Sequence, residues 1–466
     1  MGRISKPWVV TSLLLGPLAL AAALLSTNAG GSVHGQTACI FGDGPPFEFQ
    51  TYEGSEDREL FLLAQQLAAT NQLFPDSDTF ALPEILVGSA EGREPQPEAT
   101  IPVTVIQSIS WIESNLTQAA PDVPWDSIGD VLLSPDCGYG LMQVTSYFDN
   151  DGAPPSRDEA LVGAHYAYNI AVGAQILLEK WNSDFFPVVA GSEPGFIESW
   201  YYALWAYNGW AFRNHPAGTE TDPFRSLPFQ CGGPRNGYAY QELVLGCIES
   251  PPEVQDEPLW EGQPVTLPDL FVLSAAGGPL DTDVYFNGWG NVFQSQLNES
   301  PVIHPFIAMG MPLPQGAAPA DEAVLLDAAE MAVRDAILGD PSLELETSTI
   351  VLSKDDNEAT ITLANAGLGL LVYRVESDAG WLEVDIQAGV AAGPDVTFLP
   401  EQTRDATITL SANTGTAPSG SPRAAVTIEA LLPNGNVLIR VVRVEVEAAG
   451  TGIGSVPAYE AGRPES

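Results

Sequence analysis

Basic residues are scarce in this sequence, and their scarcity excludes some classes of partner. Lys and Arg together number 17 of 466 residues, against 60 Asp and Glu, which gives a formal net charge of −43. A surface this acidic does not bind nucleic acid through phosphate contacts, so we expect no nucleic-acid partner. It also repels anionic polymers at long range, and an anionic substrate would need short-range contacts that overcome this repulsion.

Histidine and cysteine are also rare, with four of each. The histidines form no cluster and the cysteine spacings fit no zinc motif, so we expect no metal and no cofactor. An even number of cysteines in an exported chain predicts two disulfides, with three connectivities open. We favour Cys231–Cys247, the nearest pair in sequence, which leaves Cys39 to pair with Cys137.

Long apolar runs are absent after the first, which extends from Trp8 to Leu25. Arg3 and Lys6 precede this run and small residues follow it, a pattern typical of a secretory signal peptide over residues 1–29. The run is about 18 residues long, so an uncleaved N-terminal membrane anchor is the alternative. We therefore expect a secreted or cell-surface protein.

Changes in composition and periodicity divide the rest of the chain. They predict an N-terminal extension with one helix and a linker, a helical domain, a Pro/Gly-rich stretch with a short helix, a β-rich domain and a disordered tail. Their expected ranges are 30–100, 101–250, 251–340, 341–447 and 448–466. The β-rich range alternates apolar and polar residues, and Asn434-Gly435 separates two such runs as a hairpin turn would. Several short strands of this kind predict a β-sandwich.

A lone carboxylate interrupts the apolar helix expected around residues 105–116. Val105, Ile109, Ile112 and Leu116 recur at helical spacing and should face a core. Glu113 lies at the edge of this stripe, where a carboxylate would be partly desolvated. A glutamate at such a border usually reaches water, so this segment alone does not establish a function.

Three further segments follow in order. "SPDCGYGLMQ" has glycines that permit a tight turn or close approach to a ligand, and "NIAVG" begins a helix with small residues on one face. "ESWYYALWAYNGW" is rich in aromatic rings, which commonly form a core but also provide platforms for sugar rings.

Together these segments resemble the soluble lytic transglycosylase (SLT) family, over residues 100–250. The resemblance implies a lysozyme-like helical fold and a peptidoglycan lytic transglycosylase. It implies Glu113 as the catalytic acid and a substrate-binding set that comprises Ser114, Gly140, Leu141, Met142, Gln143, Tyr207, Asn208 and, more loosely, Tyr240. The implied reaction cuts the MurNAc-GlcNAc β-1,4 bond of peptidoglycan strands with one glutamate and leaves a 1,6-anhydro-muramic product.

This sequence departs from the family pattern in two places. "AAPDVPWDSIGDV" looks like an insert after Glu113, and "GWAFRNHP" replaces the usual small-residue turn after Asn208. One alternative is a hydrolytic muramidase similar to goose-type lysozymes, which would need a second carboxylate. Its candidates are Asp126, Asp130, Asp136 and Asp149. An alternative of another class is a non-catalytic, glycan-binding surface protein.

The C-terminal range contains "NAGLGLLVYRVESDAGWLEV", which resembles BACON-type and related immunoglobulin-like domains. The residues that match are Asn365, Gly367, Gly369, Tyr373 and the pair Trp381-Leu382. The resemblance implies a spacer, or a unit that contacts cell-wall or other glycans. In an all-β domain a residue such as Trp381 is more often a core residue than a glycan contact. We expect a monomer with an α-helical lysozyme-like catalytic domain followed by an all-β immunoglobulin-like sandwich.

Overall fold

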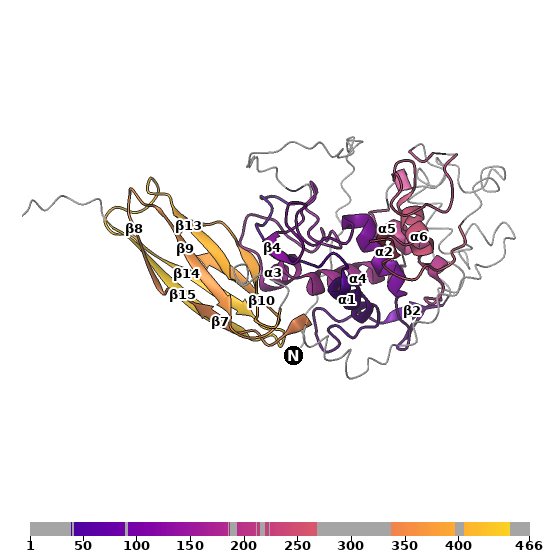
Figure 1. Cartoon of the computed structure of the whole chain (residues 1–466), viewed down its shortest axis with the longest axis horizontal. Helices are drawn as coiled ribbons and strands as arrows, with labels where there is room; N and C mark the ends of the chain where they lie inside the picture. The colour runs from indigo at the N-terminus through magenta and orange to yellow at the C-terminus, as the bar shows by residue number, and fades with distance from the viewer. Residues whose placement is uncertain are drawn as a thin grey trace, which may run out of the picture. The chain divides into compact units, whose positions relative to one another are not determined.

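The computed structural model describes two main regions, one mostly helical and one made of strands (Figure 1). The described residues are 39, 42–88, 92–184, 186, 193–210, 212–214, 220–222, 224–267, 337–396 and 405–447, and they belong to one compact unit, 38–466. The expected signal peptide and C-terminal tail, and nearly all of the short helix expected before the β-rich range, lie outside these residues.

The described part of the helical region contains six α-helices. They are α1 (Glu59–Ala69), α2 (Val103–Ser114), α3 (Arg157–Ala164), α4 (Tyr166–Asn182), α5 (Tyr201–Tyr207) and α6 (Tyr240–Glu249). Helix α2 contacts α1 and α6, and α4 contacts α1, α3 and α5. A short ladder of β1 (Gln50–Glu53) and β4 (Ser127–Asp130) lies beside them.

Helix α2 forms as its apolar pattern predicts. Val105, Ile109 and Leu116 are 0% exposed, so the stripe faces the core and its burial is what stabilises the helix. The helix ends at Asn115, which has a φ of 55° in the left-handed region that Asn tolerates better than most residues. The carboxyl end of α2, which carries Glu113, lies against α6.

Helix α4 packs closely on the turn that contains Met142. At Gly173 an added Cβ would lie 2.6 Å from two carbon atoms of Met142, so a larger residue would push this turn away. The stripe of small residues in α4 therefore serves helix-to-turn packing.

The C-terminal region is an all-β sandwich of two sheets. The five-stranded sheet has the order β12 (Ala388–Ala392), β10 (Leu370–Ser377), β14 (Arg423–Leu431), β15 (Val437–Val446) and β8 (Thr349–Leu352). The four-stranded sheet has the order β11 (Leu382–Val384), β13 (Ala406–Ala412), β9 (Glu358–Asn365) and β7 (Leu343–Leu345). The β-sandwich expected from the alternating runs is confirmed.

Two details of the sandwich follow the sequence pattern. β14 and β15 pair antiparallel with Leu431 opposite Val437, and Gly435 in the connecting turn has a φ of 79°. The hairpin predicted from Asn434-Gly435 is therefore present. Trp381 is 7% exposed and belongs to the core of the sandwich, so its indole is a packing residue.

The sandwich also contacts the helical region. Arg157 at the start of α3 donates two hydrogen bonds, of 3.0 and 2.8 Å, to the carboxylate of Glu429 in β14. The backbone N–H of Gln387 donates to the carbonyl of Glu48 at 2.9 Å.

Within the described residues, no single helix is long and apolar enough to cross a membrane. One pair of helices, α3 and α4, passes that test only when the two are taken together, and they are bent by 104°.

Candidate active site

The carboxylate of Glu113 lies in the last turn of α2, where it meets the first residue of α6. The Tyr240 hydroxyl donates a 2.5 Å hydrogen bond to Glu113 Oε1. Glu113 remains partly exposed, whereas Tyr240 is only 5% exposed. The arrangement therefore holds a carboxyl group that a ligand can reach against a donor that is fixed in the core.

Burial raises the pKa of Glu113 to about 7 because the charged form loses hydration. The hydrogen bond from Tyr240 lowers the pKa, the negative charge of Asp136 raises it, and the positive charges of Arg235 and Arg213 lower it. Near neutral pH a large fraction of Glu113 therefore carries a proton. A carboxyl group in this state can act as a general acid.

Two tyrosine rings lie side by side next to Glu113. The rings of Tyr207 and Tyr240 are 6.5 Å apart between centroids and inclined by 13°. The Tyr207 hydroxyl donates to the backbone carbonyl of Met142 at 2.9 Å. Burial and the nearby charge of Glu113 raise the pKa of both phenols well above the usual value, so both stay neutral and act as hydrogen-bond donors.

Buried side chains hold the turn that contains Leu141 and Met142. Ser114 Oγ donates to the carbonyl of Leu141 at 2.8 Å, and the N–H of Leu141 donates to Gln118 Oε1 at 2.9 Å. The N–H of Met142 donates to Asn169 Oδ1 at 2.8 Å. Leu141 and Met142 are 0% exposed and their backbone groups are occupied, so they support the site from behind. Ser114 likewise positions this turn.

The glycines of this turn permit its close packing. Gly140 has a φ of 67°, and a Cβ there would lie 2.6 Å from the amide group of Gln118. Gln143 turns its own amide back, with Nε2 donating to the carbonyl of Gly140 at 2.8 Å and Oε1 close to Gly138. The structure therefore places Gly140 and Gln143 in one turn, in which the side-chain amide of Gln143 is bonded to the backbone carbonyl of Gly140.

Asn208 joins a polar network that reaches Tyr240. Its Oδ1 accepts hydrogen bonds from Arg213 Nη2 at 3.1 Å and from Asn214 Nδ2 at 2.9 Å. Asn214 Oδ1 in turn accepts the backbone N–H of Tyr240 at 3.3 Å. Asn208, which was predicted as a site residue, ends α5 and positions Arg213 and Asn214.

Arg235 is a residue of the site that the sequence did not single out. Its guanidinium donates to the carbonyls of Ile112 at 2.7 Å and Trp111 at 3.1 Å and to Asn115 Oδ1 at 2.5 Å. These acceptors lie at the C-terminus of α2, where a cation is favourable. Arg235 comes from the loop "GGPRNGY", which has no periodicity that could have placed it.

Glu53 of β1 is a second residue that the sequence did not reveal. It is 1% exposed, and its Oε2 accepts the backbone N–H groups of Gln118 at 2.8 Å and Ala119 at 2.7 Å. Arg58 lies 3.8 Å from its other oxygen. Because Gln118 holds Leu141, Glu53 supports the same turn from one layer further out.

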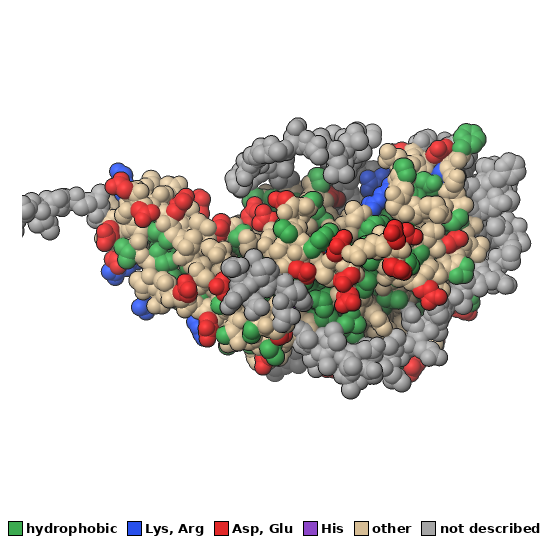
Figure 2. Space-filling view, in the orientation of Figure 1, with side chains coloured by type: hydrophobic (Ala, Val, Ile, Leu, Met, Phe, Trp, Pro, Cys, Tyr) green, Lys and Arg blue, Asp and Glu red, His purple; other side chains and the backbone are tan. Residues whose placement is uncertain are grey.

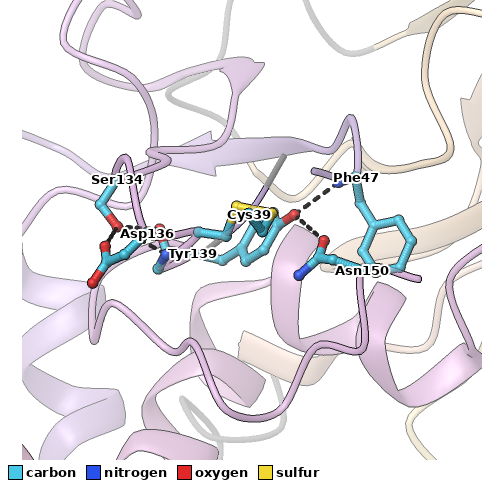
Figure 3. The surroundings of a disulfide bond; sticks show 8 residues. Cys39, Phe47, Ser134, Asp136, Tyr139 and Asn150 are labelled. Atoms are coloured by element: carbon cyan, nitrogen blue, oxygen red, sulfur yellow. Dashed lines mark hydrogen bonds between the residues drawn. A yellow bond between two sulfur atoms is a disulfide. The ribbon is translucent and has the colours of Figure 1, made fainter. Parts of the chain in front are cut away.

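Asp136 is the candidate second carboxylate that the structure connects electrostatically to Glu113. Ser134 Oγ donates to Asp136 Oδ1 at 2.5 Å, as Figure 3 shows. Asp126 instead accepts the hydroxyl of Tyr52 at 3.0 Å, and Asp130 lies on β4. Asp149 is not among the residues that shift the pKa of Glu113.

A disulfide ties the loop of Asp136 to the N-terminal segment (Figure 3). Cys39 bonds to Cys137, and beside it the hydroxyl of Tyr139 accepts the N–H of Phe47 at 2.7 Å and donates to Asn150 Oδ1 at 2.8 Å. The second disulfide joins Cys231 to Cys247, which lies on α6. Both disulfides have the connectivity favoured from the sequence. Stable disulfides are typical of an oxidising, extracytoplasmic compartment.

Among the described residues, no group of three or more His, Cys, Asp or Glu side chains is arranged to hold a metal ion.

Comparisons with known proteins give no family for this chain. No family model and no curated protein match it. Similar solved structures include the periplasmic chaperone SfaE (8% identity, TM-score 0.20, 23% of this chain and 59% of that one) and the chaperone DraB of E. coli (12%, 0.19, 23% and 56%). Another is a GH5 xyloglucanase of Bacteroides ovatus, with 16% identity and a TM-score of 0.17 over 26% of this chain and 20% of that one.

These similarities involve about a quarter of the chain, which spans little more than half the length of the chaperones. TM-scores of this size carry no argument about function.

The family resemblance expected from the sequence is wrong. No family model supports the soluble lytic transglycosylase assignment or the BACON-type assignment, and the solved structures named above are not lytic transglycosylases or lysozymes. Of the expected fold class, the all-β part stands, and a lysozyme-like helical domain is not shown. The physical reason is that short motifs serve packing: Leu141 and Met142 fill the core, and Asn208 ends a helix.

Proposed function

We propose that this protein is an exported enzyme that cleaves glycosidic bonds of peptidoglycan strands with Glu113 as general acid. The observation that carries the proposal is the partly exposed carboxyl of Glu113, which has a pKa raised to about 7 and is held by Tyr240. The two disulfides support an extracytoplasmic setting, where such a polymer is found.

The first step is protonation of the glycosidic oxygen. Glu113 donates its proton to that oxygen while the bond between the oxygen and C1 of the sugar breaks, and a cation-like centre develops at C1. The hydrogen bond from Tyr240 then stabilises the carboxylate that has formed. Tyr207 and Tyr240 supply neutral aromatic surface of the kind that contacts sugar rings.

The second step must quench C1. We infer that the substrate supplies the nucleophile, because Asp136, the candidate second carboxylate whose charge acts on Glu113, is already held by Ser134 Oγ. Its 2-acetamido group shields C1, and its 6-hydroxyl attacks C1 while the carboxylate of Glu113 accepts the hydroxyl proton. The step consumes no water, leaves a 1,6-anhydro sugar and returns Glu113 to its acidic form.

A hydrolytic muramidase is the second candidate, because the charge of Asp136 acts on Glu113. Asp136 would then activate a water molecule, and the product would keep a free reducing end.

Mass spectrometry of the products from purified peptidoglycan tests both candidates. Products lighter by one water than the hydrolysis products support the first. Reducing muramic ends that disappear in Asp136→Asn support the second. Absence of cleavage by the wild-type protein, or an active Glu113→Gln variant, would reject the enzyme assignment and leave glycan binding as the alternative.

A further inference from the structure

Arg213 is a basic residue that the proposed reaction does not use. It lies in the short helix η2 (Phe212–Asn214), in the segment that follows α5. The surface in Figure 2 shows many acidic and few basic side chains, as expected for a net charge of −43. A guanidinium whose charge acts on the proposed acid is therefore unusual in this chain.

The polar network of the site fixes where Arg213 lies. Arg213 Nη2 donates to Asn208 Oδ1, which also accepts from Asn214, and Asn214 accepts the N–H of Tyr240. Tyr240 donates to Glu113. Arg213 is thus connected to the acid by a short series of hydrogen bonds, and its charge is near enough to act on Glu113.

The guanidinium of Arg213 keeps free donors. Arg213 is exposed, and its hydrogen bond to Asn208 uses a neutral acceptor through one of its nitrogens. Arg235, which is also a basic residue of the site, instead donates its hydrogen bonds to acceptors at the end of α2.

Five other arginines in the described structure form ion pairs with glutamates. The paired arginines are Arg58, Arg157, Arg225, Arg374 and Arg423. Within the same described residues, no ion pair involves Arg213. Arg213 and Arg235 are both without an ion pair in the part of the chain that the structure describes, but only Arg213 is exposed with a single neutral acceptor, so its guanidinium is suited to an anion from outside.

We propose that Arg213 binds a carboxylate of peptide-free glycan strands, the free lactyl carboxylate on the 3-oxygen of a muramic sugar. This inference rests on the proposed function and names the group that the site recognises. The guanidinium matches a carboxylate in shape and charge, and it supplies at short range the attraction that the acidic surface lacks. Because Arg213 belongs to the polar network that reaches Tyr240 and Glu113, it would direct the carboxylate-bearing sugar to the bond that is cut.

Two substrates with the same sugar backbone test the inference. Peptide-free strands of peptidoglycan carry lactyl carboxylates, and chitooligosaccharides of equal length do not. For each we would measure kcat/KM with the wild-type protein, Arg213→Gln, Arg213→Lys and the control Arg440→Gln. Arg440 is exposed on β15, and its side chain donates to the carbonyl of Ile439.

The preference for the carboxylated strand over chitooligosaccharide should fall about tenfold in Arg213→Gln, through KM, because one charge-assisted contact is lost. Arg213→Lys should restore part of it, and Arg440→Gln should leave it unchanged. An unchanged preference in Arg213→Gln would overturn the inference. So would an equal loss on both substrates.

Binding separates failure of this inference from failure of the proposed function. The affinity of Glu113→Gln for the carboxylated strand, measured by calorimetry with and without Arg213→Gln, does not depend on catalysis. A wild-type protein that cleaves neither substrate but binds the strand through Arg213 would reject the enzyme and retain the inference. Binding that is indifferent to Arg213 would reject the inference in either case.

Discussion

The hydroxyl of Tyr240 and the carboxylate of Glu113 are 127 positions apart in the sequence and 2.5 Å apart in the structure. The contact joins the last turn of α2 to the first residue of α6. Arg235, which precedes Tyr240 in the same segment, also closes the end of α2, so two segments distant in the sequence are joined at two points around Glu113. Partial burial of a carboxyl group costs free energy, so packing alone does not account for this arrangement.

Replacement of Glu113 by Gln should abolish turnover with little change in fold. The amide keeps the shape and a hydrogen bond with Tyr240 but has no proton to give, so kcat should fall by about two to four orders of magnitude. Product release from peptidoglycan and circular dichroism would measure both properties. Asp130→Asn on β4 is a matched control and should retain activity.

The same substitution should stabilise the protein at alkaline pH. The pKa of Glu113 is raised to about 7 in the folded state, above its value in the unfolded chain. Its contribution to stability is therefore complete below about pH 4.5 and is lost as pH rises through 7. Relative to wild type, Glu113→Gln should gain about 1–3 kcal/mol between these limits. Urea unfolding at about pH 4.5 and 8 measures the gain, and an equal difference at both would contradict it.

Activity should require the protonated form of Glu113, so kcat/KM should be constant on the acid side and fall tenfold per pH unit above about 7. Tyr240→Phe removes a hydrogen bond that lowers this pKa, so the alkaline limb should shift to higher pH. Tyr238→Phe, a nearby phenol that donates to the carbonyl of Ser226, is the control. A limb that shifts to lower pH would show that the hydrogen bond favours the protonated acid instead.

Helix α6, which positions Tyr240, depends on a buried ion pair. Arg225 contacts both carboxylate oxygens of Glu242 at 2.6 and 2.7 Å, and their side chains are 2% and 0% exposed. Arg225→Met would leave a buried charge unpaired and should cost about 3–5 kcal/mol of unfolding free energy. Because burial raises the pKa of Glu242, the loss should shrink at acidic pH. Arg423→Met, in an exposed pair with Glu445, should cost less than about 1 kcal/mol.

The sequence predicted what local patterns determine. The stripe of α2, the strands of the sandwich, the turn at Asn434-Gly435 and both disulfides follow from periodicity, turn chemistry and cysteine count. Glu113 was also singled out as a candidate, since a carboxylate at the edge of an apolar stripe departs from the pattern around it. Arg235 and Glu53 were not, because each acts through partners far away in the chain. Arg213 was not, because its connection to Tyr240 runs through Asn208 and Asn214. The family was misjudged because short motifs reflect packing as readily as ancestry.

The Cys39–Cys137 disulfide should matter for both stability and activity. It closes a loop of 98 residues, for which the chain-entropy estimate is about 4–5 kcal/mol, against about 3 kcal/mol for the 16-residue separation of Cys231 and Cys247. Cys137 follows Asp136 directly in the sequence and precedes the turn of Gly140, so its release should loosen the surroundings of Glu113. The variant with both Cys39 and Cys137 changed to Ser should therefore unfold at a lower urea concentration than the wild type. It should also lose activity at urea concentrations at which it is still folded. Full activity in the folded double variant would show that the disulfide stabilises the fold without positioning the site.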